Sequence, residues 1–161
     1  MEKDKSGGFG TLTIAFYLNG ILFLILFFSA IKDWKEHIIP NVYLVRGVAI
    51  RALLLLHEVS LDGTEAIKRL GIKVGISAII FILGILIRKL TKDGIGMGDI
   101  KLCALMFLYL EANVWFSSLF VSLILGAIHA FIVTVGKKER GRIPFAPSLF
   151  AGTALVVICN I

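Results

Sequence analysis

Two aspartates in the sequence, Asp33 and Asp99, have surroundings that could support chemistry. Asp99 stands in the stretch GIGMGDIKL at residues 94–102, and Asp33 opens the stretch DWKEHIIPNVYL at residues 33–44. Two carboxyl groups placed close together cannot both ionise easily, so they share a proton and titrate as a unit. Such a pair can hold a water: one carboxylate takes its proton while the other polarises a peptide carbonyl. This is the chemistry of aspartic proteolysis, which needs neither a metal nor a covalent intermediate.

The composition of the chain is that of a membrane protein. Of its 161 residues, 58% are hydrophobic and 17% are charged, and the mean hydropathy is +0.93. Apolar runs of about 20 residues recur, the length that a helix needs to cross a bilayer core of about 30 Å. The net charge of +6 comes from residues clustered in short loops, which indicates membrane topology rather than a nucleic-acid-binding face. We therefore expect an all-α, polytopic integral membrane protein with a single domain over residues 1–161.

The apolar runs predict six transmembrane helices. The first run has no charged residue, is too long for the core of a signal peptide and lacks a small-residue cleavage pattern, so we interpret it as a retained helix. The second run carries Arg46 and Arg51, which we expect to reach the membrane surface or to pair inside the bundle. The six expected spans are residues 9–31, 38–56, 70–87, 97–110, 114–135 and 143–161.

The basic residues of the loops predict the orientation. Lysine and arginine mark the cytoplasmic side, and they are more frequent after the odd-numbered spans than on the other side. The N-terminus is therefore expected outside. Two crossings separate Asp33 from Asp99, so both acids are expected at the cytoplasmic face. The residues counted are Lys32, Lys35, Arg88, Lys89, Lys92, Lys101, Lys137, Lys138, Arg140 and Arg142, against Lys3, Lys5, Lys68, Arg69 and Lys73.

The length of the fourth span predicts the depth of Asp99. Glu111 ends the apolar run of this span and is expected at the outer interface. The stretch from Asp99 to Glu111 corresponds to about 18 Å of helix, well short of a hydrocarbon core of about 30 Å. Asp99 is therefore expected inside the membrane thickness, where an ionisable group is costly and by default functional.

Residues beside the two aspartates are expected to shape the site. Pro40 has a fixed φ and no N–H, so it suits the first turn of the second helix and fixes where that helix begins. Gly96 and Gly98 leave the backbone beside Asp99 free of side-chain bulk, so another helix or an extended peptide can approach closely.

A third stretch, GRIPFAPSLFAG at residues 141–152, opens the last expected helix. Together with Asp33, the Ile39-Pro40-Asn41 step and GMGDIKL, it closely resembles the type IV prepilin peptidase family, membrane aspartyl endopeptidases of the GxGD type. The resemblance runs in order from about residue 31 to residue 152 and implies that Asp33 and Asp99 are catalytic. It also implies a supporting or substrate-binding role for Pro40, Asn41, Gly96, Gly98, Lys101, Pro144, Phe145 and Pro147.

The resemblance further implies a substrate class and a location. The family removes a short basic leader from prepilin-like and pseudopilin precursors at the cytoplasmic face of the cell membrane. The expected partners are those precursors and the lipid bilayer, with no nucleic acid, cofactor or metal. Ala146 stands where the family commonly has glycine. Many bacterial members also carry a region with two CxxC pairs and methylate the new N-terminus; the cysteines here are Cys103 and Cys159, in apolar segments, so methyltransferase activity is not expected.

Two alternatives remain open. A GxGD intramembrane protease of the signal-peptide-peptidase kind would show a Tyr-Asp pair and a Pro-Ala-Leu step, and the sequence contains neither. A small non-enzymatic transporter subunit could use Asp33 and Asp99 as a proton relay. Such a relay would not need an Ile-Pro-Asn step and a GxGD step on the same face. Gradient-dependent transport by the purified protein without peptide cleavage would favour it.

Reporter fusions test the predicted orientation. A reporter fused after Lys92 or Lys138 should read as cytoplasmic and one fused after Asp62 as external, because the basic loops stay on the cytoplasmic side. The reverse pattern, or opposite sides for the loops at Lys35 and Lys92, would contradict a shared face for the two aspartates.

Overall fold

The chain forms a bundle of helices. The computed structural model describes residues 6–36, 38–91, 95–137 and 144–159, and no strand occurs among them. This confirms the all-α class. Some basic residues that contributed to the predicted orientation lie outside the described residues: Lys3, Lys5, Lys92, Lys138, Arg140 and Arg142. The helices are α1 (Ser6–Glu36), α2 (Asn41–Asp62), α3 (Thr64–Leu90), α4 (Met97–Tyr109), α5 (Ala112–Lys137) and α6 (Ala146–Cys159).

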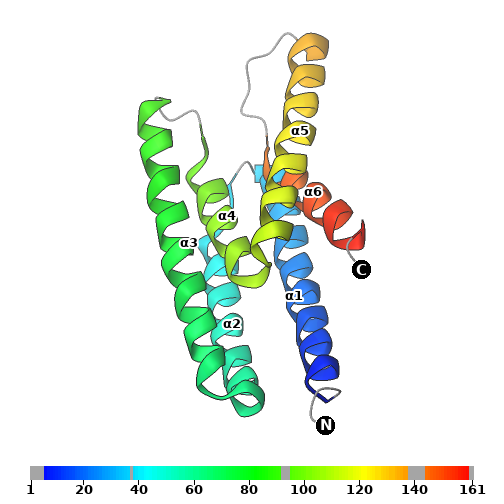
Figure 1. Ribbon diagram of the computed structural model, residues 1–161. Coiled ribbons are helices and arrows are strands. Elements are labelled where there is room, and N and C mark those ends of the chain that lie inside the picture. The colour runs from blue at the N-terminus through cyan, green and yellow to red at the C-terminus, as the bar shows by residue number, and fades with distance from the viewer. Residues whose placement is uncertain (1–5, 37, 92–94, 138–143, 160–161) are drawn as a thin grey trace.

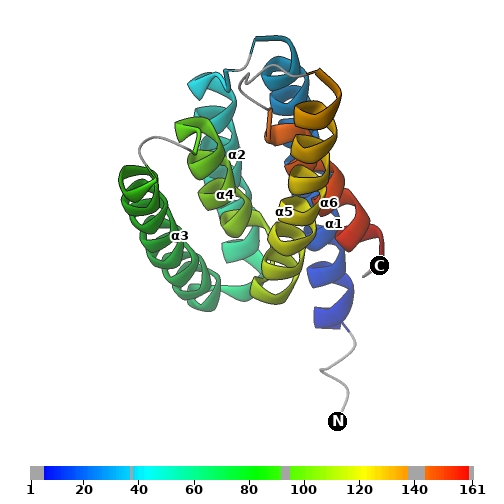
Figure 2. The same ribbon diagram turned by 90° about the horizontal axis from the view of Figure 1, so that it is seen from above.

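Successive helices run in alternating directions (Figure 1). α1, α3 and α5 end at one end of the bundle, where α2, α4 and α6 begin. We call this the aspartate end, because both Asp33 and Asp99 lie there. α6 packs against α1 and α5, while α3 packs against α2 and α4. Seen from above in Figure 2, α2 and α4 lie between α3 on one side and α1, α5 and α6 on the other.

The helices differ in their capacity to cross a bilayer. Among the described residues, the segments Phe16–Glu36, Thr64–Leu90 and Ala112–Thr134 are long and apolar enough to do so by length and composition. α6 is apolar but has 14 residues. α2 carries charged residues along its 22 positions, and α4 has 13 residues, about 20 Å of helix. Six helices are therefore found where six were expected, and three of them have the length and hydropathy of a complete span.

Burial is concentrated in the shortest internal helix. Most of α4 is buried, including Leu102 and Met106, and so is Leu110, the residue that follows the helix. In contrast, α3 buries Ala66 and Ser77 and exposes large aliphatic side chains along its length. Apolar side chains on the outside and a packed helix at the centre are the arrangement expected when lipid covers the surface. α4 therefore lies inside a shell made by its neighbours.

Small residues bring the helices close together. A Cβ atom at Gly47 of α2 would lie 2.8 Å from the Leu105 side chain of α4. A Cβ atom at Gly152 of α6 would lie 2.7 Å from the backbone nitrogen of Ser122 in α5. Close approach at small residues is how helices gain packing energy in lipid, where burial of apolar surface supplies little.

The boundary expected for the first helix is wrong. The apolar run was expected to end at residue 31, but α1 continues to Glu36, so Asp33 lies in a helix rather than in a loop. Lys32 and Glu36 form an i, i+4 ion pair on the exposed side of this extension, an arrangement that favours continued helix. Pro40 precedes α2 as its N-terminal cap residue, which agrees with its expected role in fixing the start of that helix.

Candidate active site

Asp33 contributes a buried carboxylate from the last turns of α1. Its exposed fraction is 7%, and its Oδ2 accepts a hydrogen bond from the backbone N–H of Ala146 at 3.0 Å. Ala146 is the first residue of α6. The positive end of the α6 dipole therefore lies against Asp33, an arrangement that is favourable for an anion.

The sequence at the start of α6 leaves this N–H free to reach Asp33. The first turn of a helix has N–H groups without intrahelical acceptors. Pro147 has no N–H, and the N–H groups of Ser148 and Leu149 donate to the carbonyl of Phe145 at 3.0 and 3.1 Å. The remaining first-turn donor is the N–H of Ala146, and Asp33 accepts it. The FAP step thus directs one backbone donor at the carboxylate.

Phe145 holds the start of α6 against α5. A Cβ atom at Gly126 of α5 would lie 2.7 Å from the Phe145 ring, so the ring packs directly on the glycine backbone. Pro144, partly buried, immediately precedes it. The three predicted supporting residues of this stretch therefore lie at the α6 start, beside Asp33, and Phe145 ties that start to a second helix.

Asp99 contributes the second carboxylate from the first turn of α4. A Cβ atom at Gly96 would lie 2.6 Å from the Asp99 Oδ2, so the absence of a side chain at Gly96 makes room for this carboxylate. The Oδ1 of Asp99 is buried and has no hydrogen-bond partner within the described protein. Asp33 lies close enough to interact electrostatically with Asp99. The two aspartates therefore converge, and one buried oxygen is available to a bound molecule.

Two contacts join the start of α4 to the start of α2. A Cβ atom at Gly98 would lie 2.8 Å from the Ile39 Cβ, so the backbone of α4 packs against the side chain that precedes Pro40. The Lys101 ammonium donates a hydrogen bond to the Asn41 Oδ1 at 2.9 Å. Gly98, Lys101 and Asn41 were predicted separately as supporting residues, and the structure connects them through these contacts.

Two contacts of residues in or next to the site were not predicted from the sequence. Ala146 was noted as a departure from a family pattern, whereas its backbone N–H contacts Asp33. Trp34, exposed beside Asp33, stacks on His129 of α5 with ring centroids 5.8 Å apart. Pro147 was the sequence signal for the contact between Ala146 and Asp33, because proline has no N–H and so leaves fewer backbone donors in the first turn of α6. No signal in the sequence pairs Trp34 with His129.

The described residues hold no group of three or more histidine, cysteine, aspartate or glutamate side chains that could bind a metal ion. What the site offers is a pair of carboxyl groups, a backbone donor and an unpartnered carboxylate oxygen. That set can exchange a proton with a water and polarise a carbonyl.

Comparison with known proteins agrees with the motifs. The family model described as the type IV leader peptidase family matches residues 20–131. A protein of Bacillus subtilis (strain 168) named prepilin leader peptidase/N-methyltransferase is 30% identical over 136 residues, which covers 83% of this chain and 52% of that relative. The chain therefore spans about half the length of that relative. No solved structure gives a significant match.

The contact between Gly98 and Ile39 predicts a difference between two glycine substitutions. Gly98→Ala should lower the free energy of unfolding by about 1 to 3 kcal/mol, because the added methyl overpacks the junction of α2 and α4. Gly20→Ala is the matched control: nothing lies within 4 Å of a Cβ there, so it should be neutral or stabilise α1 by about 0.5–1 kcal/mol. Thermal unfolding of both variants in one detergent measures the difference. Equal stability of the two would show that the junction is not tightly packed.

Proposed function

Because the chain belongs to the type IV leader peptidase family, we propose that it is a membrane aspartic endopeptidase whose catalytic pair is Asp33 and Asp99. Its substrates are prepilin-like or pseudopilin precursors, from which it removes the short basic leader. Cleavage takes place at the cytoplasmic face of the cell membrane.

One observation carries this proposal: two carboxylates from different helices converge at one end of the bundle. Asp33 comes from the last turns of α1 and Asp99 from the first turn of α4. The unpartnered Oδ1 of Asp99 is the group to which a substrate or water would bind. A buried polar atom without a partner is costly, and a bound molecule would remove that cost.

The proposed reaction follows from a shared proton. In the resting pair one carboxyl is ionised and the other is protonated. The ionised carboxylate takes a proton from a water as the water oxygen attacks the scissile carbonyl carbon, and the protonated carboxyl donates a hydrogen bond to the carbonyl oxygen. The tetrahedral intermediate then collapses, and a carboxyl proton passes to the leaving amine. The Ala146 N–H holds Asp33 in place throughout.

Helix ends at the aspartate end suit a hydrophobic substrate. In Figure 1, α3 and α5 extend past the points where α4 and α6 begin. Both are candidate membrane spans, which supports a carboxylate pair recessed from the membrane surface. A precursor whose leader is followed by a hydrophobic helix would bring its peptide bond to this depth while that helix remains in lipid.

The proposed function covers peptide cleavage by the single expected domain and does not include methyl transfer. The relative's name includes an N-methyltransferase, but the alignment covers 52% of that protein. The 161 residues of this chain contain no CxxC pair, so methyl transfer is not part of the proposed function. Lys101 and Asn41, hydrogen-bonded to each other, are proposed to hold the start of α4, which carries Asp99, against the start of α2.

Asp33→Asn and Asp99→Asn should each abolish cleavage of a prepilin-like precursor while the protein remains folded. Asparagine keeps the shape and can still accept the Ala146 N–H, but it neither carries the negative charge nor passes the proton. Because the pair acts as a unit, the double variant should be little worse than either single one. Cleavage by the protein in detergent or vesicles, followed by gel shift of the precursor, provides the measurement.

Glu36→Gln is the matched control for these variants, because it is a carboxylate on the same helix whose side chain is 50% exposed. Asp93→Asn, in the part of the chain outside the described residues, is a second control. Both should retain most activity. Cleavage at near wild-type rate by Asp33→Asn would rule out the aspartate mechanism, and proton-coupled transport in its place would favour the relay.

Chelation tests the proposed independence of metal. An aspartate pair activates water by itself, so strong chelators should leave cleavage unchanged in the same assay. Loss of activity in chelator, with recovery on adding zinc or another divalent ion, would contradict the proposed mechanism.

A further inference from the structure

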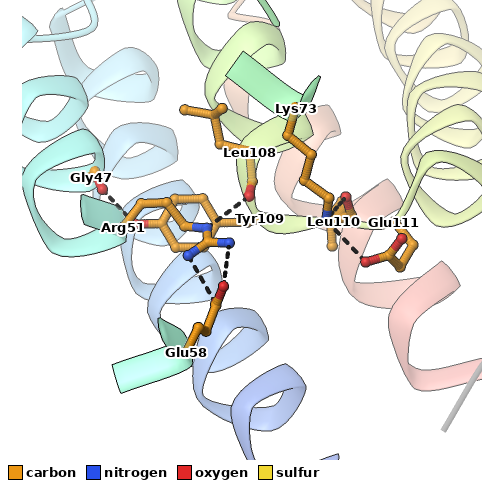
Figure 3. A network of polar contacts seen from close by, with 8 residues as sticks. All are labelled: Gly47, Arg51, Glu58, Lys73, Leu108, Tyr109, Leu110 and Glu111. Atoms are coloured by element: carbon orange, nitrogen blue, oxygen red, sulfur yellow. Dashed lines mark hydrogen bonds and ion pairs between the residues drawn. The ribbon is translucent and has the colours of Figure 1, made fainter. Parts of the chain in front are cut away.

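A second polar network lies at the other end of α4, away from the aspartates (Figure 3). Two cationic side chains from two different helices there donate to backbone carbonyls at the end of α4. Arg51 of α2 donates from Nε to the Leu108 carbonyl at 3.0 Å, and Lys73 of α3 donates from Nζ to the Leu110 carbonyl at 3.2 Å. We call Arg51 and Lys73 the cation clamp.

The clamp supplies hydrogen-bond donors to the carbonyls at the end of the short helix α4. The last carbonyls of a helix have no intrahelical donor, and lipid offers none. α4 has 13 residues and ends among buried residues, so water does not reach those carbonyls freely. The N–H of Leu110 donates to the Met106 carbonyl at 3.0 Å, and the clamp then contacts the carbonyls of Leu108 and Leu110. Cations at a helix C-terminus are also favoured by the helix dipole.

Arg51 is buried and held in place by an ion pair within α2. It is 4% exposed, and its guanidinium forms an ion pair with Glu58 of the same helix at 2.9 Å. The Tyr109 hydroxyl donates to the Gly47 carbonyl, one turn before Arg51. α2 therefore contacts the α4 terminus through both a donor and an acceptor. A buried cation with one counterion and one carbonyl is costly to place, and surface exposure would have avoided that cost.

Lys73 reaches the same terminus from α3. Its ammonium contacts both the Leu110 carbonyl and the Glu111 carboxylate, the latter at 2.9 Å. The Lys73 side chain is 19% exposed and that of Glu111 is 81% exposed. The carbonyl contact is therefore the more sheltered of the two, and an exposed ion pair contributes little by itself.

We propose that Arg51 and Lys73 are positioning residues that fix how far α4 extends along the bundle, and so fix the place of Asp99 in its first turn. This inference rests on the proposed function, because it assigns the clamp a role in aligning Asp99 with Asp33. α4 is a rigid element with Asp99 at one end and the clamp at the other. Releasing the clamp lets α4 shift along its axis, and misplacement of a catalytic group by about 1 Å can cost on the order of 100-fold in rate.

Lys73→Met tests the clamp through kinetics. It should lower kcat on the order of 10-fold or more with KM unchanged within about two-fold, because alignment of the carboxylates is lost while substrate binding is kept. Lys73→Arg, which can still donate to the carbonyl, should restore most of kcat. A double variant, Arg51→Met with Glu58→Met, should also lower kcat; it removes the buried Arg51 charge together with its partly buried counterion, so neither is left unpaired.

Two matched controls separate the clamp from loss of charge or of an ion pair. Lys68→Met removes a lysine from the same helix, one that pairs with Glu65 on the exposed surface. Glu111→Gln removes the ion pair to Lys73 and leaves the carbonyl contact possible. Both should keep wild-type kcat. A loss in Glu111→Gln equal to that in Lys73→Met would overturn the proposal, because the ion pair would then be the cause.

A thiol probe reports the position of α4 without any cleavage. Ile95, 36% exposed, lies just before α4. In a background of Cys103→Ala and Cys159→Ala, the rate at which Ile95→Cys reacts with a membrane-impermeant maleimide should change several-fold on adding Lys73→Met and stay unchanged with Lys68→Met. If Lys73→Met changes the maleimide reaction rate while the protein without this substitution shows no peptidase activity, the clamp is supported and the proposed function is refuted. An unchanged rate with unchanged kcat would overturn the clamp.

Discussion

The organisation of this molecule depends on a helix too short to cross a bilayer. α4 has 13 residues, about 20 Å, whereas the hydrocarbon core is about 30 Å thick. The carbonyls at the C-terminal end of α4 lie among buried residues and therefore need polar partners from neighbouring helices. The N-terminal end carries Asp99 and joins α2 through Lys101 and Asn41. The C-terminal end is met by Arg51 and Lys73. A long helix would place its ends in water and would not require this shell, nor would it hold a carboxylate at this depth.

The remaining helices are arranged to let α4 and Asp33 come close. Gly47 and Gly98 bring the backbones of α2 and α4 against large side chains of the neighbouring segment, and Gly152 brings α6 against the backbone of α5. α6 also packs on α1, so its first residue reaches Asp33. Close packing at small residues sets how near the helix backbones lie to their neighbours. These contacts set the spacing between the helices, and the cation clamp is proposed to set how far α4 extends along them.

Much of this could be predicted from the sequence, and the exceptions have physical causes. The apolar runs predicted six helices, and the two acids, separated by two crossings, were expected on one face; the structure places them at one end. The end of α1 could not be found from hydropathy, because Lys32, Asp33 and Glu36 are charged yet helical. The capping of α4 by Arg51 was also out of reach. A charge within an apolar run indicates a partner, but only three-dimensional packing shows that the partners are a glutamate on the same helix and a carbonyl from another.

At the start of α6, the alanine at position 146, where the family commonly has glycine, keeps the backbone contact with Asp33. Ala146 replaces the more common glycine, yet the contact with Asp33 uses the backbone N–H, which both residues possess. The Ala146 side chain is fully buried, so its methyl group is accommodated within the packed start of α6. Pro147 has no N–H, and the N–H groups of Ser148 and Leu149 donate to the Phe145 carbonyl, so Ala146 is the remaining donor of this first turn. The chemical requirement at this step therefore concerns which backbone donors exist, and less which side chain residue 146 carries.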